Sequence, residues 1–167
     1  MIYSRPGTDS PVDQGDIIHN CPILTIREFD VANPGVPRVV CEVKPVVVLT
    51  QACDLANRKV SQVNVCVIWS AEEIVAAGRL KGVDVRGPIR AARIFGWYFL
   101  PKDEQVGMVE SIVDLRHIHT LSLDVLSALC QAGHRRARIQ PLFREHLGKH
   151  FGDTFSRIGL PAPYETE

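Results

Sequence analysis

The chain has 167 residues and no net formal charge, because 19 Lys and Arg residues balance 19 Asp and Glu residues. Its hydrophobic share of 46% and charged share of 23% are average for a globular domain. No apolar run approaches 18 residues, so no membrane-spanning helix is predicted. The first residues, MIYSRPGTDSP, lack the apolar core of a signal peptide. These features predict one cytoplasmic domain that needs no cofactor and has no membrane partner.

The cysteines are odd in number and form no CxxC pair, which is typical of a protein with reduced thiols. They stand at positions 21, 41, 53, 66 and 130. A chain of this length buries enough surface to fold without disulfides or a structural metal.

Alternating or continuous apolar runs predict strands through the first two thirds of the chain. In chain order these strands fall at 15–18 and 22–26, 39–43 and 46–49, 60–69, 93–100, and 108–115. The segment 30–38, DVANPGVPR, contains two prolines and a glycine and is predicted to be a loop. Pro45 cannot donate to a strand ladder, so it is expected at a strand start or edge. A short helical insert is predicted at 71–79, AEEIVAAGR.

The apolar period changes from 2 to 3.6 near residue 120. Ser122 is a plausible N-cap for a helix that Gly133 ends, at about 122–132. A second helix is expected at 141–158. Its apolar stripe comprises Phe143, Leu147, Phe151, Phe155 and Ile158, and the first four of these are predicted to be buried against the barrel.

The order of elements favours a mainly β chain with α-helices over a doubly wound sheet, because no long crossover helix lies between residues 15 and 70. We therefore predict an SH3-like small β-barrel with mostly antiparallel strands over residues 1–120, including an N-terminal arm and the helical insert. Two helices over residues 121–167 are expected to pack on the barrel.

Three strand-end motifs resemble toxins of the MazF/PemK type, which are SH3-like barrel endoribonucleases. Gly15-Asp16-Ile17 resembles the first element of that family, KPVVVLT at 44–50 the second, and VNVCVIWS at 63–70 the third. Lys44 stands where the family has an arginine before the proline, and Ser70 falls where the family places a hydroxyl residue. The tail from Arg144 is similar to uncharacterised bacterial proteins that combine a TQ-x-CD turn with an RxGLP ending.

This resemblance implies association with RNA or DNA in a bacterial toxin–antitoxin or phage-defence operon, with binding favoured over cleavage. A protein partner encoded nearby and an oligomeric state are both compatible with it. The alternative is a module that binds a protein or small ligand without touching nucleic acid, and a hydrolase that depends on Cys53 is a third hypothesis.

The span from Arg116 to His150 is rich in basic residues. It forms either an ordinary solvated helix face or a surface that contacts phosphates. The predicted nucleic-acid-binding residues are Lys44, Arg116, Arg135, Arg136, Arg138 and Arg144.

The turn TQACDL at 50–55 places reactive side chains at the end of an apolar strand. Cys53, Asp54 and Ser70 are the candidate catalytic residues, since a thiol becomes nucleophilic when a base lowers its pKa. His19 could be that base, and Asp114 or His117 could complete a triad. The structural alternative is a half-buried thiol beside an Asp54 that caps its own turn.

Three further sets of residues have both a structural and a functional interpretation. His19, Cys21, Cys53 and Asp54 offer zinc-compatible ligand types without the spacing of a known zinc module. His146 and His150 have metal-compatible helical spacing, but the sequence HLGKH favours a solvated helix face. Strand alternation predicts Asp114 and Arg116 on one face and His117 and His119 on the other, with Arg116 either paired to Asp114 or joined by Arg144 or Arg157 in an anion site.

Overall fold

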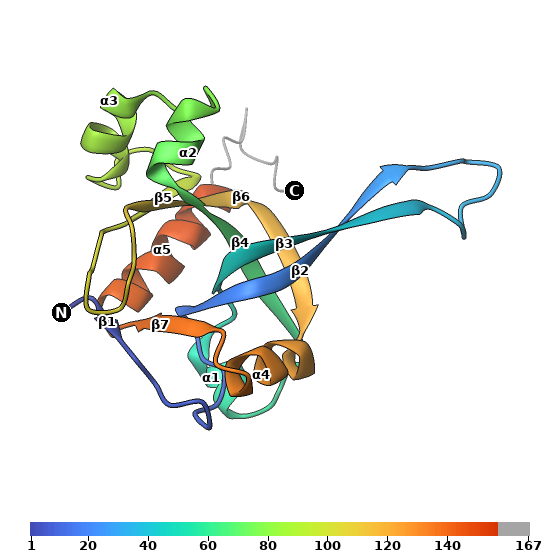
Figure 1. Cartoon of the computed structure of the whole chain (residues 1–167), viewed down its shortest axis with the longest axis horizontal. Helices are drawn as coiled ribbons and strands as arrows, with labels where there is room; N and C mark the ends of the chain where they lie inside the picture. The colour runs from blue at the N-terminus through green and yellow to red at the C-terminus, as the bar shows by residue number, and fades with distance from the viewer. Residues whose placement is uncertain (157–167) are drawn as a thin grey trace, which may run out of the picture.

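A seven-stranded antiparallel sheet forms the centre of the molecule in the computed structural model, which describes residues 1–156 (Figure 1). The strands lie side by side in the order β1-β7-β2-β3-β4-β6-β5. Their bounds are Tyr3–Ser4 (β1), Asp16–Glu28 (β2), Arg38–Val48 (β3), Gln62–Ser70 (β4), Trp97–Leu100 (β5), Ser111–Ser122 (β6) and Arg135–Ile139 (β7). The prediction of a mainly β chain with antiparallel strands is therefore confirmed.

The predicted closed barrel is wrong, because the sheet is open. Its edge strands are β1 and β5, which have only two and four residues. No strand pairing joins these edges within residues 1–156. The Tyr3 hydroxyl of β1 donates to the carbonyl of Pro101, just after β5, at 3.0 Å, so a side-chain hydrogen bond links the two edges where strand pairing is absent. Strands this short offer too few backbone groups to close a ladder.

The chain after residue 120 differs from the predicted pair of consecutive helices. Helix α4 (Leu123–Gln131) and helix α5 (Phe143–Phe155) are separated by β7, which pairs with both β1 and β2. Ala137 and Ile139 on β7 are buried, so HRRARIQ does alternate with a period of two. This strand was not predicted, because its arginines indicated a solvated charged surface.

The shorter helices lie in the connections. Helix α1 (Ala52–Ala56) follows β3, and the insert after β4 comprises α2 (Ala71–Ala76), α3 (Gly82–Asp84) and a π-helical turn, η1 (Val85–Ile89). Side-chain hydroxyls of Ser70 and Ser122 accept hydrogen bonds from the backbone N–H groups of Glu73 and Val125, so they are the N-caps of α2 and α4. The helical insert and the Ser122 cap were both predicted. No helix within residues 1–156 is long and apolar enough to cross a membrane.

The predicted buried stripe of α5 is only partly correct. Leu147 is fully buried and Phe151 packs against the main core, but Phe143 and Phe155 are 41% and 53% exposed. Steps of four residues advance the helix by about 40° beyond a full turn, so Phe143 and Phe155 lie about 120° apart around the axis. They cannot face the same core. Ile158 lies outside the described residues.

The hairpin of β2 and β3 extends beyond the rest of the sheet (Figure 1). β7 pairs only with Asp16–Ile18 of β2, and β4 pairs only with Val46–Val48 of β3, so the outer halves of the two strands pair only with each other. The predicted loop at 30–38 is the tip of this hairpin. Pro45 lies opposite a β-bulge in β2, where a strand tolerates a missing N–H.

Candidate nucleic-acid interface

Carboxylates engage five of the six residues that the sequence predicted to bind nucleic acid. Lys44 pairs with Glu42 at 3.2 Å, and Arg116 pairs with Asp114 at 2.9 Å. The remaining pairs involve Arg135, Arg138 and Arg144 with acidic residues of the N-terminal segment and α5. Arg136 forms no ion pair within residues 1–156. Most of the predicted positive charge is therefore already neutralised inside the fold.

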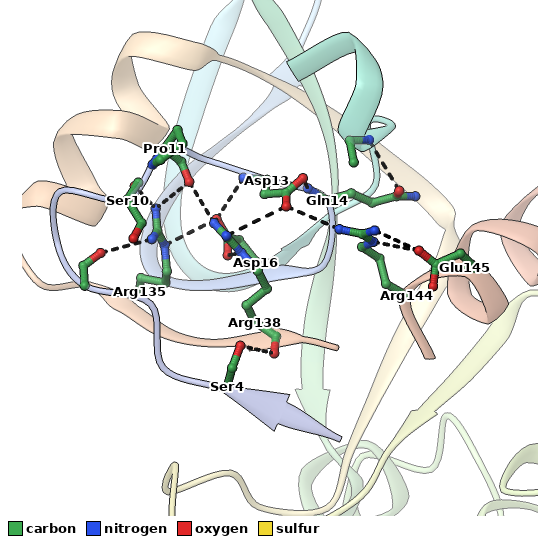
Figure 2. Close-up of polar contacts among 12 residues, drawn as sticks. Ser4, Ser10, Pro11, Asp13, Gln14, Asp16, Arg135, Arg138, Arg144 and Glu145 are labelled. Atoms are coloured by element: carbon green, nitrogen blue, oxygen red, sulfur yellow. Dashed lines mark hydrogen bonds and ion pairs between the residues drawn. The ribbon is translucent and has the colours of Figure 1, made fainter. Parts of the chain in front are cut away.

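Asp16, the first residue of β2, holds two of these arginines (Figure 2). Its side chain is fully buried. Arg138 donates from Nε to Oδ1 of Asp16 at 2.6 Å and from a terminal nitrogen to Oδ2 at 2.9 Å. Arg135, with a side chain only 3% exposed, brings its Nε within 3.2 Å of Oδ2. A buried carboxylate between two guanidiniums is a structural arrangement, because losing one partner leaves a charge without compensation.

The same arginines fasten the N-terminal segment to the sheet (Figure 2). Arg135 donates to the carbonyl of Ser10 at 2.7 Å, and Arg138 donates to the carbonyl of Pro11 at 2.7 Å. Arg144 of α5 donates to Asp13 at 3.3 Å and to Glu145 at 2.8 Å. This network ties residues 7–16, β7 and α5 together, so its guanidiniums are not free to bind phosphate.

Asp114 on β6 organises a second ion cluster. Its buried carboxylate accepts hydrogen bonds from Arg116 at 2.9 Å and lies 2.8 Å from Nδ1 of His117. Burial alone would raise the pKa of Asp114, but the hydrogen bonds from Arg116 and His117 outweigh it and hold that pKa below its usual value. The predicted alternation is wrong here, because a bulge between the partners of Cys66 and Ile68 turns His117 to the same side as Asp114.

The predicted anion site of Arg116 with Arg144 or Arg157 is not assembled. Arg116 stacks over the Trp97 ring at 4.2 Å, whereas Arg144 belongs to the Asp13 network. Arg157 lies outside the described residues.

The predicted catalytic residues do not converge on one reaction centre. Cys53 is exposed on α1, and its sulfur lies 3.6 Å from Oε1 of Gln51 and 3.8 Å from Oδ1 of Asp54. It contacts no histidine among residues 1–156. Ser70 uses its hydroxyl as a helix cap. Asp114 and His117 pair with each other, so neither completes a triad with Cys53 and His19.

The residues considered for zinc are likewise dispersed. Residues 1–156 contain no group of three or more His, Cys, Asp or Glu side chains placed to hold a metal ion. Cys21 is buried, which raises the pKa of its thiol to about 12 and keeps it protonated.

The histidine pair on α5 was predicted to lie on a solvated face, and this is wrong for His150. That side chain is buried, and its Nε2 lies 3.1 Å from the carbonyl oxygen of Trp97. His146 is exposed and lies 3.1 Å from the Tyr98 hydroxyl through Nδ1. Both imidazoles are held by the sheet, so they position α5.

A different basic surface is assembled from three separate parts of the chain. An open cavity of about 460 Å³ lies between the segment after β1, the bulge of β2 and the start of β7. We name it the basic pocket. Its lining is Arg5, Pro6, His19, Asn20, Gly133, His134, Arg135 and Arg136. No carboxylate is among these residues, and neither Arg5 nor Arg136 forms an ion pair with the part of the chain that the structure describes.

Two left-handed backbone positions shape the basic pocket. Asn20 has a φ of 59° at the β2 bulge, and Gly133 has a φ of 82° in the turn between α4 and β7. These turns bring His19 and His134 together, and the N–H of His19 donates to the carbonyl of His134 at 2.9 Å. Nδ2 of Asn20 lies 2.9 Å from Nδ1 of His134. If the Asn20 amide donates, a neutral His134 carries its proton on Nε2.

The guanidiniums supply fixed positive charge in the basic pocket. Burial lowers the pKa of His19, and the nearby Arg136 and His134 lower it further. His19 is therefore uncharged near pH 7, and an entering anion would favour its protonation. This combination of two unpaired guanidiniums and two imidazoles suits a phosphate group.

A smaller cavity of about 170 Å³ shares one lining residue, His19, with the basic pocket. Gly107, Ser70 and the acidic residue Glu73 are among the residues that line this second cavity. A Cβ at Gly107 would come within 3.1 Å of an Arg136 terminal nitrogen, so the loop after β5 passes close to that guanidinium.

Sequence reasoning missed Arg5, Asn20 and His134 as members of a site. Their only local signal is proximity to a turn, at Pro6 and Gly133. The pairing of β7 with β2 brings together residues more than a hundred positions apart, and no local pattern encodes it. Comparison with known proteins found no family model and no curated protein that matches this chain.

Proposed function

We propose that this chain binds the phosphate backbone of nucleic acid at the basic pocket and does so without cleaving the strand. The observation that carries this proposal is an open cavity with two imidazoles, no carboxylate among its lining residues and two guanidiniums that form no ion pair within residues 1–156. An arginine that neutralises a phosphate releases the counterions condensed on the nucleic acid, and this release drives binding. Arg136 is the residue common to this site and to the sequence-based prediction.

An extended ligand fits this surface better than a small isolated anion. The basic pocket is open to solvent, so a nucleic-acid strand can pass across it and place one of its phosphates at the guanidiniums. RNA is the first ligand to test, since the first 70 residues resemble toxins of the MazF/PemK type. The context we propose is accordingly a bacterial toxin–antitoxin or phage-defence operon.

Binding without cleavage is supported by the arrangement of the reactive side chains. Cys53 and Asp54 lie on α1 without a histidine in contact among residues 1–156, and Ser70 caps α2. The two imidazoles of the basic pocket are the groups in it whose chemistry suits proton transfer. The integrity of RNA after incubation with the protein therefore tests the proposal that binding occurs without cleavage.

The experiment measures fluorescence anisotropy of labelled single-stranded RNA and DNA across a salt series. It compares the wild type with an Arg5→Ala/Arg136→Ala double variant. We expect the dissociation constant of the double variant to rise at least about tenfold. Its salt slope should fall by about 0.7 for each phosphate that the variant no longer neutralises.

The matched control is an Arg86→Ala/Arg93→Ala double variant, which removes the same charge from exposed positions outside the basic pocket. Equal weakening by both double variants would show that net charge rather than the pocket decides affinity. Absence of binding by the wild type at low salt would refute nucleic-acid binding. RNA cleavage that His19→Gln or His134→Gln abolishes would refute binding without chemistry.

A further inference from the structure

The turn TQACDL, which the proposed function does not use, lines a separate polar cavity. This cavity has a volume of about 410 Å³ and lies between the end of β3, α1, the start of β4 and α5. We name it the amide pocket. Its volume is in the range of sites that hold small ligands. Six polar side chains line it: Gln14, Thr50, Gln51, Asp54, Gln62 and Asn64.

Gln14 is a buried residue of the amide pocket whose hydrogen-bonding capacity is not filled. It is only 9% exposed. Its Nε2 donates to the carbonyl of Leu49 and its Oε1 accepts from the N–H of Ala52, both at 3.4 Å, which is longer than an ordinary hydrogen bond (Figure 2). A Cβ at Gly148 would lie 3.0 Å from this Nε2, so α5 closes over the carboxamide at a glycine. A carboxamide can make four hydrogen bonds, so a ligand in the amide pocket can supply those that the described chain does not.

The polar groups nearer the solvent also have capacity left within residues 1–156. The Asp54 carboxylate forms no ion pair there, and its contact with the Cys53 sulfur is 3.8 Å long. Asn64 accepts from the Thr120 hydroxyl through Oδ1, which leaves its amide nitrogen as a donor. Gln62 is exposed, and its side chain forms no hydrogen bond with the described residues. The amide pocket therefore offers a carboxylate that only accepts hydrogen bonds, together with several amide donors.

The charge of the amide pocket is opposite to that of the basic pocket. No Lys, Arg or His is among its lining residues, and Asp54 gives it one negative charge. Phe151 is partly buried against the main core and adds an apolar ring to the lining. The pocket thus disfavours a phosphate. It suits an uncharged ligand with an apolar ring surface, with N–H groups that donate to the carboxylate and an oxygen that accepts from the amides.

We propose that the amide pocket binds a guanine base. The Watson–Crick edge of guanine has two adjacent N–H donors, which one carboxylate accepts as a pair, and beside them a carbonyl oxygen for an amide donor. Adenine, cytosine and uracil each place an acceptor next to their donor on this edge, and the Asp54 carboxylate repels that acceptor.

The choice of a base rather than a sugar rests on the proposed nucleic-acid binding. Gln14 of the amide pocket and His19 of the basic pocket are five residues apart, so their Cα atoms are at most about 18 Å apart. About five stacked nucleotides cover that distance. A strand with a phosphate at the basic pocket can therefore bring a base to the amide pocket.

The first test uses nucleosides, because they carry no phosphate and do not need the basic pocket. NMR shift titrations compare guanosine, adenosine, cytidine, uridine and the neutral disaccharide cellobiose. We expect guanosine to bind at least about fivefold more tightly than each of the others, which is the discrimination of one bidentate pair. Asp54→Asn replaces an acceptor by a donor and should abolish this preference. Gln62→Ala should weaken guanosine binding at least about threefold.

Three control variants separate the amide pocket from the rest of the surface. Asp9→Asn and Gln131→Ala remove the same chemical groups from exposed positions that do not line the amide pocket, so both should bind guanosine as the wild type does. The Arg5→Ala/Arg136→Ala double variant should also retain guanosine binding.

The second test compares oligouridylate with the same RNA carrying one central guanosine. The guanosine should tighten binding at least about fivefold, and Asp54→Asn should remove this gain without weakening the binding of oligouridylate. RNA binding with no preference for guanosine would overturn the inference and leave the proposed function intact. Guanosine binding by a protein that binds no RNA would support the amide pocket and refute the proposed function.

Three further outcomes would overturn the inference. The first is absence of guanosine binding at millimolar concentration. The second is tighter binding of cellobiose than of guanosine, which would assign the amide pocket to a sugar. The third is a guanosine preference that persists in Asp54→Asn with unchanged circular dichroism, which would place the base elsewhere.

Discussion

The three arginines of β7 have two different roles, and a comparison of their contacts shows what determines each role. Arg135 and Arg138 point to the buried carboxylate of Asp16 and to carbonyls of the N-terminal segment. Arg136, between them, lines the basic pocket with Arg5 and has no carboxylate partner within residues 1–156. The same residue type therefore builds the fold at two positions and offers free charge at the third.

The lesson is that formal charge and available charge are different quantities. A basic run in a sequence counts guanidiniums, but ligand binding depends on those that no internal carboxylate has neutralised. The Asp16 network and the basic pocket share β7, so substitutions along this strand can separate stability from binding.

The largest expected effect is on the Asp16 network. Asp16→Asn leaves the buried guanidiniums of Arg135 and Arg138 without a counter-charge, so the free energy of unfolding should fall by about 3–5 kcal/mol. Urea denaturation at neutral pH measures this. Asp9→Asn is the control, because Asp9 is exposed and should change stability by less than about 0.5 kcal/mol. An Asp16→Asn variant as stable as the control would contradict the structural role of the network.

A smaller loss is expected at Asp114, whose partners are half-exposed. Asp114→Asn should cost about 1–3 kcal/mol at neutral pH. The pKa of Asp114 is lower in the folded protein than its ordinary value of 3.8, so its contribution is present above that value and is lost as pH falls through the folded pKa. Urea denaturation at pH 7 and near pH 3 should show the difference between wild type and variant shrinking in acid. A constant difference would show that the charge of Asp114 is not responsible.

Arg136→Ala should hardly change stability, by less than about 0.5 kcal/mol, since the side chain is exposed and pairs with no carboxylate in the described part of the chain. Arg138→Ala, two residues along the same strand, should cost several times more. Thermal melts of the two variants side by side test this directly. An equal loss of stability in both variants would contradict the assignment of Arg138 to the fold and of Arg136 to binding.

The smallest expected effect is the pH dependence of nucleic-acid affinity. The pKa of His19 lies below its ordinary value of 6.5, and a bound phosphate would raise it, so protons are taken up on binding. Affinity for an oligouridylate, which does not titrate in this range, should therefore rise as pH falls below about 6.5, and His19→Gln should reduce that rise. Affinity that does not depend on pH between 5 and 7.5 would show that His19 does not face the bound phosphate.

Local patterns predicted much of the sheet but not its closure or its strand order. Apolar alternation located β2, β3, β4 and β6, and the caps at Ser122 and Gly133 located α4. β7 was missed because its core-facing residues, Ala137 and Ile139, alternate with arginines that suggested a solvated surface. Without β7 the remaining strands appeared to form a small barrel.

The candidate site was less accessible to sequence reasoning than the fold. Arg136 was predicted, and His19 was noted for a different role beside Cys53. Their association with Arg5 and His134 depends on the bulge at Asn20 and on the pairing of β2 with β7, which are long-range features. The turn at Cys53 contains reactive residue types, but strand ends commonly carry such residues without forming a catalytic site.

The central claim is that phosphate binds where β2 and β7 bring His19 and His134 together. NMR spectra of the six imidazoles, recorded while a short single-stranded RNA is added, test it most directly. We predict that the resonances of His19 and His134 shift together and saturate, while those of His117 beside Asp114 and of His150 in the core do not move. Shifts confined to His117 and His119, or no shift at any imidazole while the RNA is bound, would contradict the account.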